Sequence, residues 1–242
     1  MTYCVAIAVN DGLVFTSDSR TNAGVDQIST YSKMHQFGIP GMRQFVILSA
    51  GNLATTQGVI KKLEMDIKEG AALNLMSVSS MDDAADYLGQ INLAQQSKYG
   101  SSSNVSYEAS FIIGGQIKNS APSLFLVYPQ GNHIAPSETT PYLQIGESKY
   151  GKPILDRILA PDTDLETAAL CALVSMDSTM RSNLTVGPPI ESLVYSSDSF
   201  SLDQHHKLNE GSNFLRELNV AWDSRLREAF SKLSSTLTWP SN

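Results

Sequence analysis

Along this chain, short apolar runs typical of buried strands alternate with segments whose apolar residues recur at helical spacing. The first two runs are separated by Asn10-Asp11-Gly12, and an Asp-Gly between two such runs favours a β-hairpin. Further apolar runs follow later in the chain, each bounded by turn residues. The predicted strands cover residues 3–9, 13–17, 44–50, 108–117, 123–128, 141–146 and 190–197.

Helical spacing begins after the third strand. Val59, Ile60, Leu63 and Ile67 fall on one face of a helix, and Gly70 marks its end. Four further helices are predicted later in the chain, and the last of them is amphipathic. The predicted helices cover residues 53–69, about 81–98, about 149–159, about 163–180 and about 209–234.

The order of these elements indicates the fold class. Strands occur in groups and helices in pairs, which favours an α+β fold of two stacked sheets covered by helices over a parallel sheet wound from βαβ units. No repeat, low-complexity stretch or change of composition divides the chain. We therefore expect one domain over residues 1–242.

Composition narrows the possible partners. The 242 residues are 42% hydrophobic and 17% charged, as in a globular protein with a sizeable core. The chain has 24 acidic and 17 basic residues, a net charge of −7, and its densest basic group is only the pair Lys61-Lys62. Nucleic acids and anionic membranes attract concentrated positive charge, so neither is an expected partner.

The cellular compartment is predicted from three features. Cys4 and Cys171 lie far apart in apolar runs, which is typical of buried thiols in a reducing compartment. The N-terminal stretch lacks the basic and continuously apolar regions of a signal peptide. No apolar run approaches the roughly 20 residues of a membrane span. A cytoplasmic location is the prediction.

Thr2 is the first candidate for chemistry. An initiator Met is normally removed before a small side chain, which would leave Thr2 with both a hydroxyl and a free α-amine. An α-amine has an unperturbed pKa of about 8, so it can accept the hydroxyl proton near neutral pH. A nearby ammonium group would lower that pKa further. This pairing is a known form of activated nucleophile.

Three later residues supply what such a nucleophile needs. Lys33 offers the cation, Asp18 at the end of the second predicted strand offers an acid to hold it, and Gly51 offers a backbone N–H for an oxyanion at a strand-to-helix corner. Singly they are more often a solvated charge, a turn cap and a helix-start turn. Their joint occurrence with Thr2 is what indicates an activated N-terminal nucleophile.

These residues resemble the proteasome β-subunit superfamily, which includes the bacterial HslV peptidase. The resemblance is carried by Thr2, by FTSDSR at 15–20, by KMH at 33–35 and by LSAG at 48–51. The stretches SDSRTNAGVDQISTYSKMH and IGESKYGKPILDR are similar to the Anbu group of bacterial proteasome-related peptidases. The resemblance extends over essentially the whole chain and implies a four-layer αββα sandwich of the N-terminal nucleophile (Ntn) hydrolase class.

The resemblance also implies roles for individual residues. It makes Thr2 the nucleophile, Asp18 and Lys33 the charged pair beside it, and Gly51 the source of the oxyanion N–H. Arg20 matches a structural arginine of the same loop.

The resemblance also gives less specific roles to residues of a supporting loop and of the substrate pocket. Asp177 and Ser182 match a polar loop that supports the terminal Thr from the far side, although Asp177 could equally be a surface acid near a helix end. The positions that match the family's substrate pocket are Thr21, Tyr31, Ser49 and Leu53.

One stretch departs from the family pattern. Proteasome β subunits carry Gly-Ser-Gly where this chain has Gly146-Glu147-Ser148, so either a carboxylate replaces the hydroxyl or the catalytic serine shifts to Ser148. Glu147 could instead pair with Lys149 or Lys152.

The expected activity is that of a threonine peptidase that hydrolyses peptides or unfolded protein through an acyl-enzyme ester, without cofactor or metal, as a homo-oligomeric ring or helix. The alternatives are an Ntn amidohydrolase acting on a small non-protein amide, and a catalytically silent assembly subunit, which is favoured if Met1 is retained or if Glu147 blocks the site. No ATPase partner is indicated by the sequence. The adjacent His205 and His206 do not face one another on a helix, so a polar loop is expected there instead of a metal site.

Overall fold

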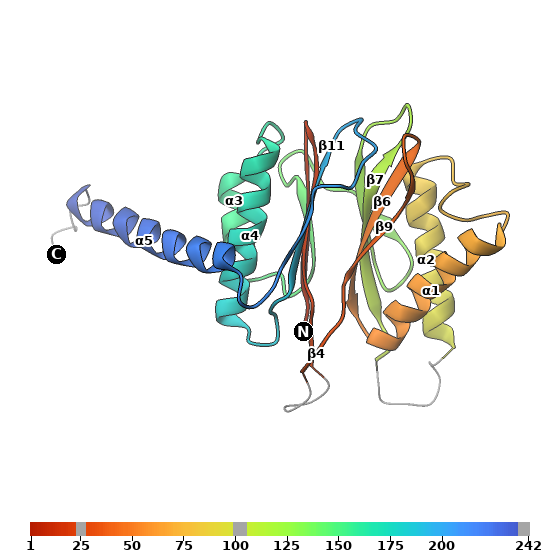
Figure 1. Ribbon diagram of the computed structural model, residues 1–242, viewed down its shortest axis with the longest axis horizontal. Helices are drawn as coiled ribbons and strands as arrows, with labels where there is room; N and C mark the ends of the chain where they lie inside the picture. The colour runs from red at the N-terminus through yellow and green to blue at the C-terminus, as the bar shows by residue number, and fades with distance from the viewer. Residues whose placement is uncertain (23–27, 99–105, 237–242) are drawn as a thin grey trace, which may run out of the picture.

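Two antiparallel sheets stack face to face, and each is covered on its outer side by a pair of helices (Figure 1). The structure is a computed structural model, and it describes residues 1–22, 28–98 and 106–236. The layers therefore follow the order helices, sheet, sheet, helices, which is the expected α+β, αββα sandwich. The N-terminus lies at one open end of this sandwich (Figure 1).

The first sheet has five strands in the order β10-β1-β2-β11-β12. Its β1–β2 hairpin turns at Asn10-Asp11, with Val9 opposite Gly12. The strands are β1 (Tyr3–Val9), β2 (Gly12–Asp18), β10 (Tyr142–Gly146), β11 (Ile190–Ser196) and β12 (His205–Leu208).

The second sheet also has five strands, in the order β5-β6-β7-β8-β9, and a short pair, β3 with β4, stands apart from both sheets. The strands of the second sheet are β5 (Met34–Ile39), β6 (Arg43–Gly51), β7 (Ala109–Ile117), β8 (Ser123–Val127) and β9 (His133–Ile134). The separate pair consists of β3 (Arg20–Asn22) and β4 (Ile28–Thr30).

Helices α1 (Leu53–Glu69) and α2 (Met81–Ser97) cover the second sheet, and α3 (Lys152–Ile158) and α4 (Leu165–Ser182) cover the first (Figure 1). The fifth helix, α5 (Asn213–Thr236), leaves the body beside α4 and projects away from it (Figure 1). Its residues Leu215 and Leu218 still pack on the core, so only its first half is anchored.

Strand β1 shows how the sequence builds the layers. Tyr3, Val5 and Ile7 face the core beneath α3 and α4, whereas Cys4 and Ala6 face the second sheet. Because both faces of the strand are buried, it has a continuous apolar run in place of a polar alternation. The small side chains on the inner face let the two sheets approach closely.

The predicted order of elements is confirmed, with differences at the ends. The third helix begins at Lys152 instead of about residue 149, because Pro153 suits the first turn of a helix and Gly151 lies tightly against Ser175. The last helix begins at Asn213 instead of about residue 209.

The prediction of a polar loop at His205 and His206 is wrong. Both residues belong to β12, where they pair with Leu193 and Ser192 of β11. The sequence analysis also missed β5, because this strand lies at the edge of its sheet and several of its side chains are exposed. None of the helices in the described part of the chain combines the length and the apolar character needed to cross a membrane.

Two helical glycines provide a matched test of the packing. A Cβ on Gly89 of α2 would lie 2.1 Å from the carbonyl oxygen of Gly131, whereas a Cβ on Gly58 of α1 would meet only the end of the Gln95 side chain, at 2.9 Å. We expect Gly89→Ala to destabilise the protein by about 1–3 kcal/mol through overpacking. Gly58→Ala should be neutral or stabilising by up to about 1 kcal/mol, because Ala favours helix. Urea unfolding at fixed protein concentration measures both, and equal effects would contradict the assigned packing.

Candidate active site

The end of β10 holds Thr2 in place at the start of β1. The Thr2 carbonyl accepts a 2.7 Å hydrogen bond from the N–H of Glu147, and the next residue, Tyr3, pairs with Gly146. Gly146 has a φ of +82°, and a Cβ at this position would lie 2.0 Å from the Thr2 carbonyl oxygen. Only glycine allows this approach, so Gly146 fixes the backbone of Thr2.

A buried ion pair between Lys33 and Asp18 lies beside Thr2. Lys33 Nζ donates to Asp18 Oδ1 at 2.6 Å and to the carbonyl oxygen of Arg20 at 2.8 Å. Asp18 also accepts the N–H groups of Tyr3 at 3.0 Å and Gly187 at 3.3 Å. Asp18 is fully buried and Lys33 is 7% exposed. The pair therefore joins the ends of β1 and β2 to the residues before β5 and before β11.

This arrangement sets the electrostatics at the start of the chain. Burial raises the pKa of Asp18, while the Lys33 ammonium and the two backbone N–H groups act in the opposite direction. At the α-amine of Met1, burial and then the Lys33 charge lower the pKa below its usual value, against an opposing effect of Asp18. An amine at this end of the chain is thus biased toward its free-base form.

A cavity of about 920 Å³ opens beside Thr2. Lys33 and Gly51 also lie on its wall, so the structure brings the candidate nucleophile, the cation and the proposed oxyanion donor to one space. Asp18 lies behind Lys33, outside the wall. The four residues expected in the substrate pocket all line this cavity: Thr21, Tyr31, Ser49 and Leu53.

Gly51 ends β6 with a φ of +113°. The N–H of Ser49 donates to the carbonyl of Lys33, and the N–H of Asn52 donates to the carbonyl of Glu108. Since successive N–H groups of a strand point to opposite sides, the N–H of Gly51 points to the same side as that of Ser49. It lies beyond the end of the β5–β6 ladder, next to the cavity.

Arg20 supports the ion pair from outside. Its Nη1 donates to the carbonyl of Leu184 at 2.9 Å, and its guanidinium packs against Gly187, whose N–H binds Asp18. These contacts hold the 184–187 segment against the site.

Glu147 is buried next to Thr2, with 9% of its surface exposed, whereas the neighbouring Ser148 is exposed. The Glu147 carboxylate accepts the backbone N–H of Lys149 and the side-chain amide of Asn183, each at 3.3 Å. Glu147 thus contacts Lys149 through the backbone, and neither lysine ammonium forms an ion pair with it in the described part of the chain; the Lys152 ammonium binds Asp156 instead. Glu147, and not Ser148, is therefore the buried residue beside Thr2.

Asp177 and Ser182 do not lie on the cavity wall. The expectation of a polar loop is wrong here, since α4 continues to Ser182. Asp177 is buried, accepts the side-chain amide of Asn219 at 2.8 Å and lies 3.7 Å from Arg181, so it contributes to the junction of α4 with α5. Ser182 is exposed at the end of the helix.

The sequence analysis missed several residues that line this cavity, and His35 is the one nearest to Lys33 in the sequence with a titratable side chain. His35 follows Lys33 by two positions at the start of β5, and both side chains line the cavity. Burial lowers the pKa of His35, against an opposing effect of Glu191. Extended backbone over residues 33–39 would have placed Lys33 and His35 on one face. Within the described ranges, no group of three or more His, Cys, Asp or Glu residues could hold a metal ion.

Comparisons with known proteins identify the family of the chain. The family described as "Proteasome subunit" matches residues 2–194. Among solved structures, Anbu (ancestral beta-subunit) from Yersinia bercovieri is 45% identical, with a TM-score of 0.92 and 100% of both chains covered. The helical assembly of the Anbu complex from Pseudomonas aeruginosa is 44% identical, with a TM-score of 0.93, covering 100% of this chain and 99% of that one. A Gly-1 mutant of Anbu from Hyphomicrobium sp. strain MC1 is 43% identical, with a TM-score of 0.91, covering 97% and 100%. No curated protein gives a significant match.

The buried pair predicts a characteristic pattern of stability. Asp18→Asn should destabilise the fold by about 3–5 kcal/mol, because it leaves the Lys33 ammonium buried without a counter-charge. The double variant Asp18→Asn/Lys33→Met should lose less than the sum of the two single variants. The four proteins of this cycle are the natural chain, Asp18→Asn, Lys33→Met and the double variant. Urea unfolding of each at one protein concentration gives the coupling free energy between the two side chains. Additive losses would show that the two side chains do not act as a pair.

Proposed function

The chain belongs to the proteasome subunit family, within its Anbu group, and from this premise we propose that it is a threonine peptidase with Thr2 as nucleophile. The observation that carries the proposal is the buried Lys33–Asp18 pair beside Thr2, at the edge of a cavity that could hold a peptide side chain. The family gives the class of chemistry, and the geometry gives each residue its part.

The reaction requires removal of Met1, which frees the α-amine of Thr2. This amine accepts the proton of Thr2 Oγ as the oxygen attacks a peptide carbonyl. The carbonyl oxygen becomes an oxyanion that accepts the N–H of Gly51. Collapse of the intermediate breaks the C–N bond, and the leaving amine takes the proton from the α-amine. Water then hydrolyses the acyl ester on Thr2 and restores the enzyme.

Lys33 adjusts the protonation of this amine. A lysine ammonium has three N–H groups, and two of them bind Asp18 and the Arg20 carbonyl. The third remains for the space around Thr2. Burial and the Lys33 charge already lower the pKa of the amine at Met1, and both would act on the amine of Thr2, one residue closer to the pair. The free base that catalysis needs is favoured.

The substrate we propose is a peptide or an unfolded protein segment. The cavity beside Thr2 is large, and the residues on its wall carry charges of both signs, including Lys61 and Glu64. Such a wall admits varied side chains. The buried thiols of Cys4 and Cys171, both unpaired, fit the cytoplasm as the site of action.

We also propose a homo-oligomer, in the form of a ring or a helix, in which α5 makes a contact between copies. The relative from Pseudomonas aeruginosa is described as a helical assembly. Helix α5 projects from the body (Figure 1), and large apolar side chains along it are exposed, among them Val220 at 63% and Phe230 at 67%. Exposed apolar surface of this kind marks an interaction site.

A catalytically silent assembly subunit is the alternative that one observation favours. Glu147 places a carboxylate where related β subunits have a serine hydroxyl, and an ionised carboxylate can accept but not donate a hydrogen bond. Retention of Met1 would also make the subunit catalytically silent, because the amine of Thr2 would then be part of a peptide bond and could not accept a proton.

The nucleophile can be identified by mass. We expect the intact mass of the protein purified from cells to lack Met1, and a peptide epoxyketone to add one equivalent at Thr2. Thr2→Ala should lose the adduct and at least about a thousandfold in peptidase rate. Ser182→Ala, which removes an exposed hydroxyl outside the cavity, should react like the natural protein. Complete retention of Met1 would overturn the peptidase proposal and favour the silent subunit.

The role of α5 can be tested by charge. Val220→Glu and Phe230→Glu should shift the protein from large assemblies toward monomers in sedimentation velocity, because a buried interface does not accept an unpaired carboxylate. Leu73→Glu is the matched control, since Leu73 is also exposed but lies between α1 and α2. Assemblies that persist in both α5 variants would place the contact elsewhere.

A further inference from the structure

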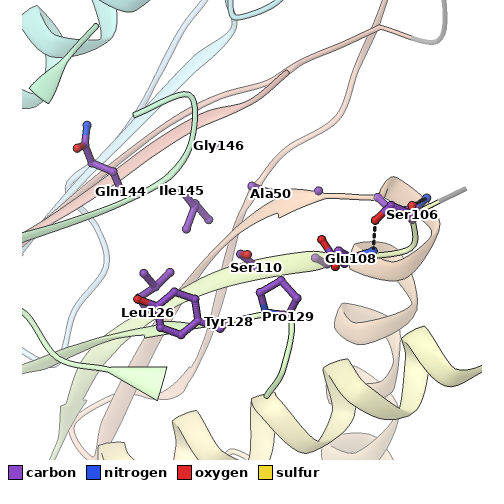
Figure 2. A pocket seen from close by; sticks show the side chains of 13 residues that line it. Ala50, Ser106, Glu108, Ser110, Leu126, Tyr128, Pro129, Gln144, Ile145 and Gly146 are labelled. Carbon is purple, nitrogen blue, oxygen red and sulfur yellow. Dashed lines mark hydrogen bonds between the residues drawn. The ribbon is translucent and has the colours of Figure 1, made fainter. Parts of the chain in front are cut away.

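A second cavity, of about 510 Å³, lies on the other side of the two glycines that flank Thr2. Ala50, Gly51 and Gly146 border this cavity and also border the cavity of Thr2. Figure 2 shows residues of β10 on one side of the space and residues of β7 and β8 on the other. The two cavities thus meet where the nucleophile would attack.

Strand β10 presents a free backbone edge to this second cavity. β10 is the outer strand of its sheet and pairs with β1 alone. The N–H of Glu147 binds Thr2 and the carbonyl of Pro141 binds Ala8, so odd-numbered residues of β10 are directed toward β1. By alternation, the N–H and carbonyl of Gln144 point outward. The Gln144 side chain binds the hydroxyl of Tyr3, which belongs to the core beneath the helices, so its backbone is what borders the cavity.

The walls combine apolar surface with one charge. Leu126, Tyr128 and Ile145 contribute apolar surface near the centre of the space (Figure 2). Among the described residues of the wall, Glu108 is the single ionised one. Its backbone N–H binds Ser106, and its exposed carboxylate makes no ion pair or hydrogen bond with any described residue. The negative charge is therefore available to a ligand.

We propose that this second cavity binds the part of the substrate on the amine side of the cleaved bond, and that Glu108 selects a basic side chain there. The proposal rests on the peptidase function proposed above. If the acyl side occupies the cavity of Thr2, the leaving side must continue past Gly51 and Gly146, and this is the adjoining space. An extended segment can pair with the N–H and carbonyl of Gln144, as peptides do at other open sheet edges.

A basic residue fits the remaining features of the cavity. The long aliphatic stem of Lys or Arg can lie on Leu126 and Tyr128 while its charged end reaches Glu108. A glutamate in the same place would meet a like charge. Glu108 is thus a specificity-determining residue for the leaving group, and it takes no part in the chemistry at Thr2.

Cleavage of paired peptides tests this assignment. Internally quenched peptides would share every residue on the acyl side and carry Lys, Gln or Glu at the first or second position on the amine side. We expect kcat/KM for the better Lys peptide to exceed that for the matching Glu peptide by about fivefold, the upper value of an exposed ion pair. The preference should vanish in Glu108→Gln and reverse in Glu108→Lys. Glu69→Gln makes the same change of charge on an exposed residue outside both cavities and should keep the preference.

Two further measurements separate this proposal from the peptidase function. A peptide anilide carries no amino acid on the amine side, so its cleavage reports the chemistry at Thr2 alone. Binding of a labelled Lys-containing peptide to the Thr2→Ala variant, measured by fluorescence anisotropy, reports the cavity without catalysis, and Glu108→Gln should weaken it by about fivefold.

The outcomes are distinct. Cleavage of the anilide without any Glu108-dependent preference or binding would overturn the second site and leave the peptidase intact. Glu108-dependent binding without cleavage of the anilide would support the second site and overturn the peptidase. Failure of both measurements would overturn both proposals.

Discussion

The buried contact between Lys33 and Asp18 is the interaction on which the site depends. Placing two charges in a protein interior is costly, and good geometry with further hydrogen bonds must offset the loss of water. The structure meets this condition, because the backbone N–H groups of Tyr3 and Gly187 and the carbonyl of Arg20 complete the network. Three segments among the first 33 residues, and a fourth at Gly187, must therefore be in place before the first residues of β1 can be held.

Glycines at two strand ends shape the space around this network. Gly146 allows the end of β10 to approach the carbonyl of Thr2, and Gly51 turns the end of β6 away from its ladder at a positive φ. A Cβ on either glycine would meet backbone, at Glu108 for Gly51 and at Thr2 for Gly146, so both glycines are needed for close packing. The two strand ends that pack in this way also form the border that the two cavities share.

Much of the fold could be predicted because its central strands are buried on both faces and have continuous apolar runs. Edge strands lack this signal, which explains why β5 was missed and why His205 was expected in a loop. The pairing of Asp18 with Lys33 was expected from the chemistry that a terminal Thr requires and from the family resemblance, since no local pattern reports a contact across strands. Asp177 shows the limit of that resemblance, because its partner Asn219 lies on α5, a helix whose direction depends on long-range packing.

Glu147 shows why positioning and proton transfer must be considered separately at this site. Its backbone N–H holds the Thr2 carbonyl, and any residue except proline could supply this bond. Its carboxylate is occupied by two neutral donors, Asn183 and the N–H of Lys149. Each carboxylate oxygen thus accepts one neutral donor, and the carboxylate forms no ion pair with any residue that the structure describes. In the proposed mechanism, the position of Thr2 thus depends on the backbone at residue 147, whereas activation of its hydroxyl depends on its own amine and on Lys33.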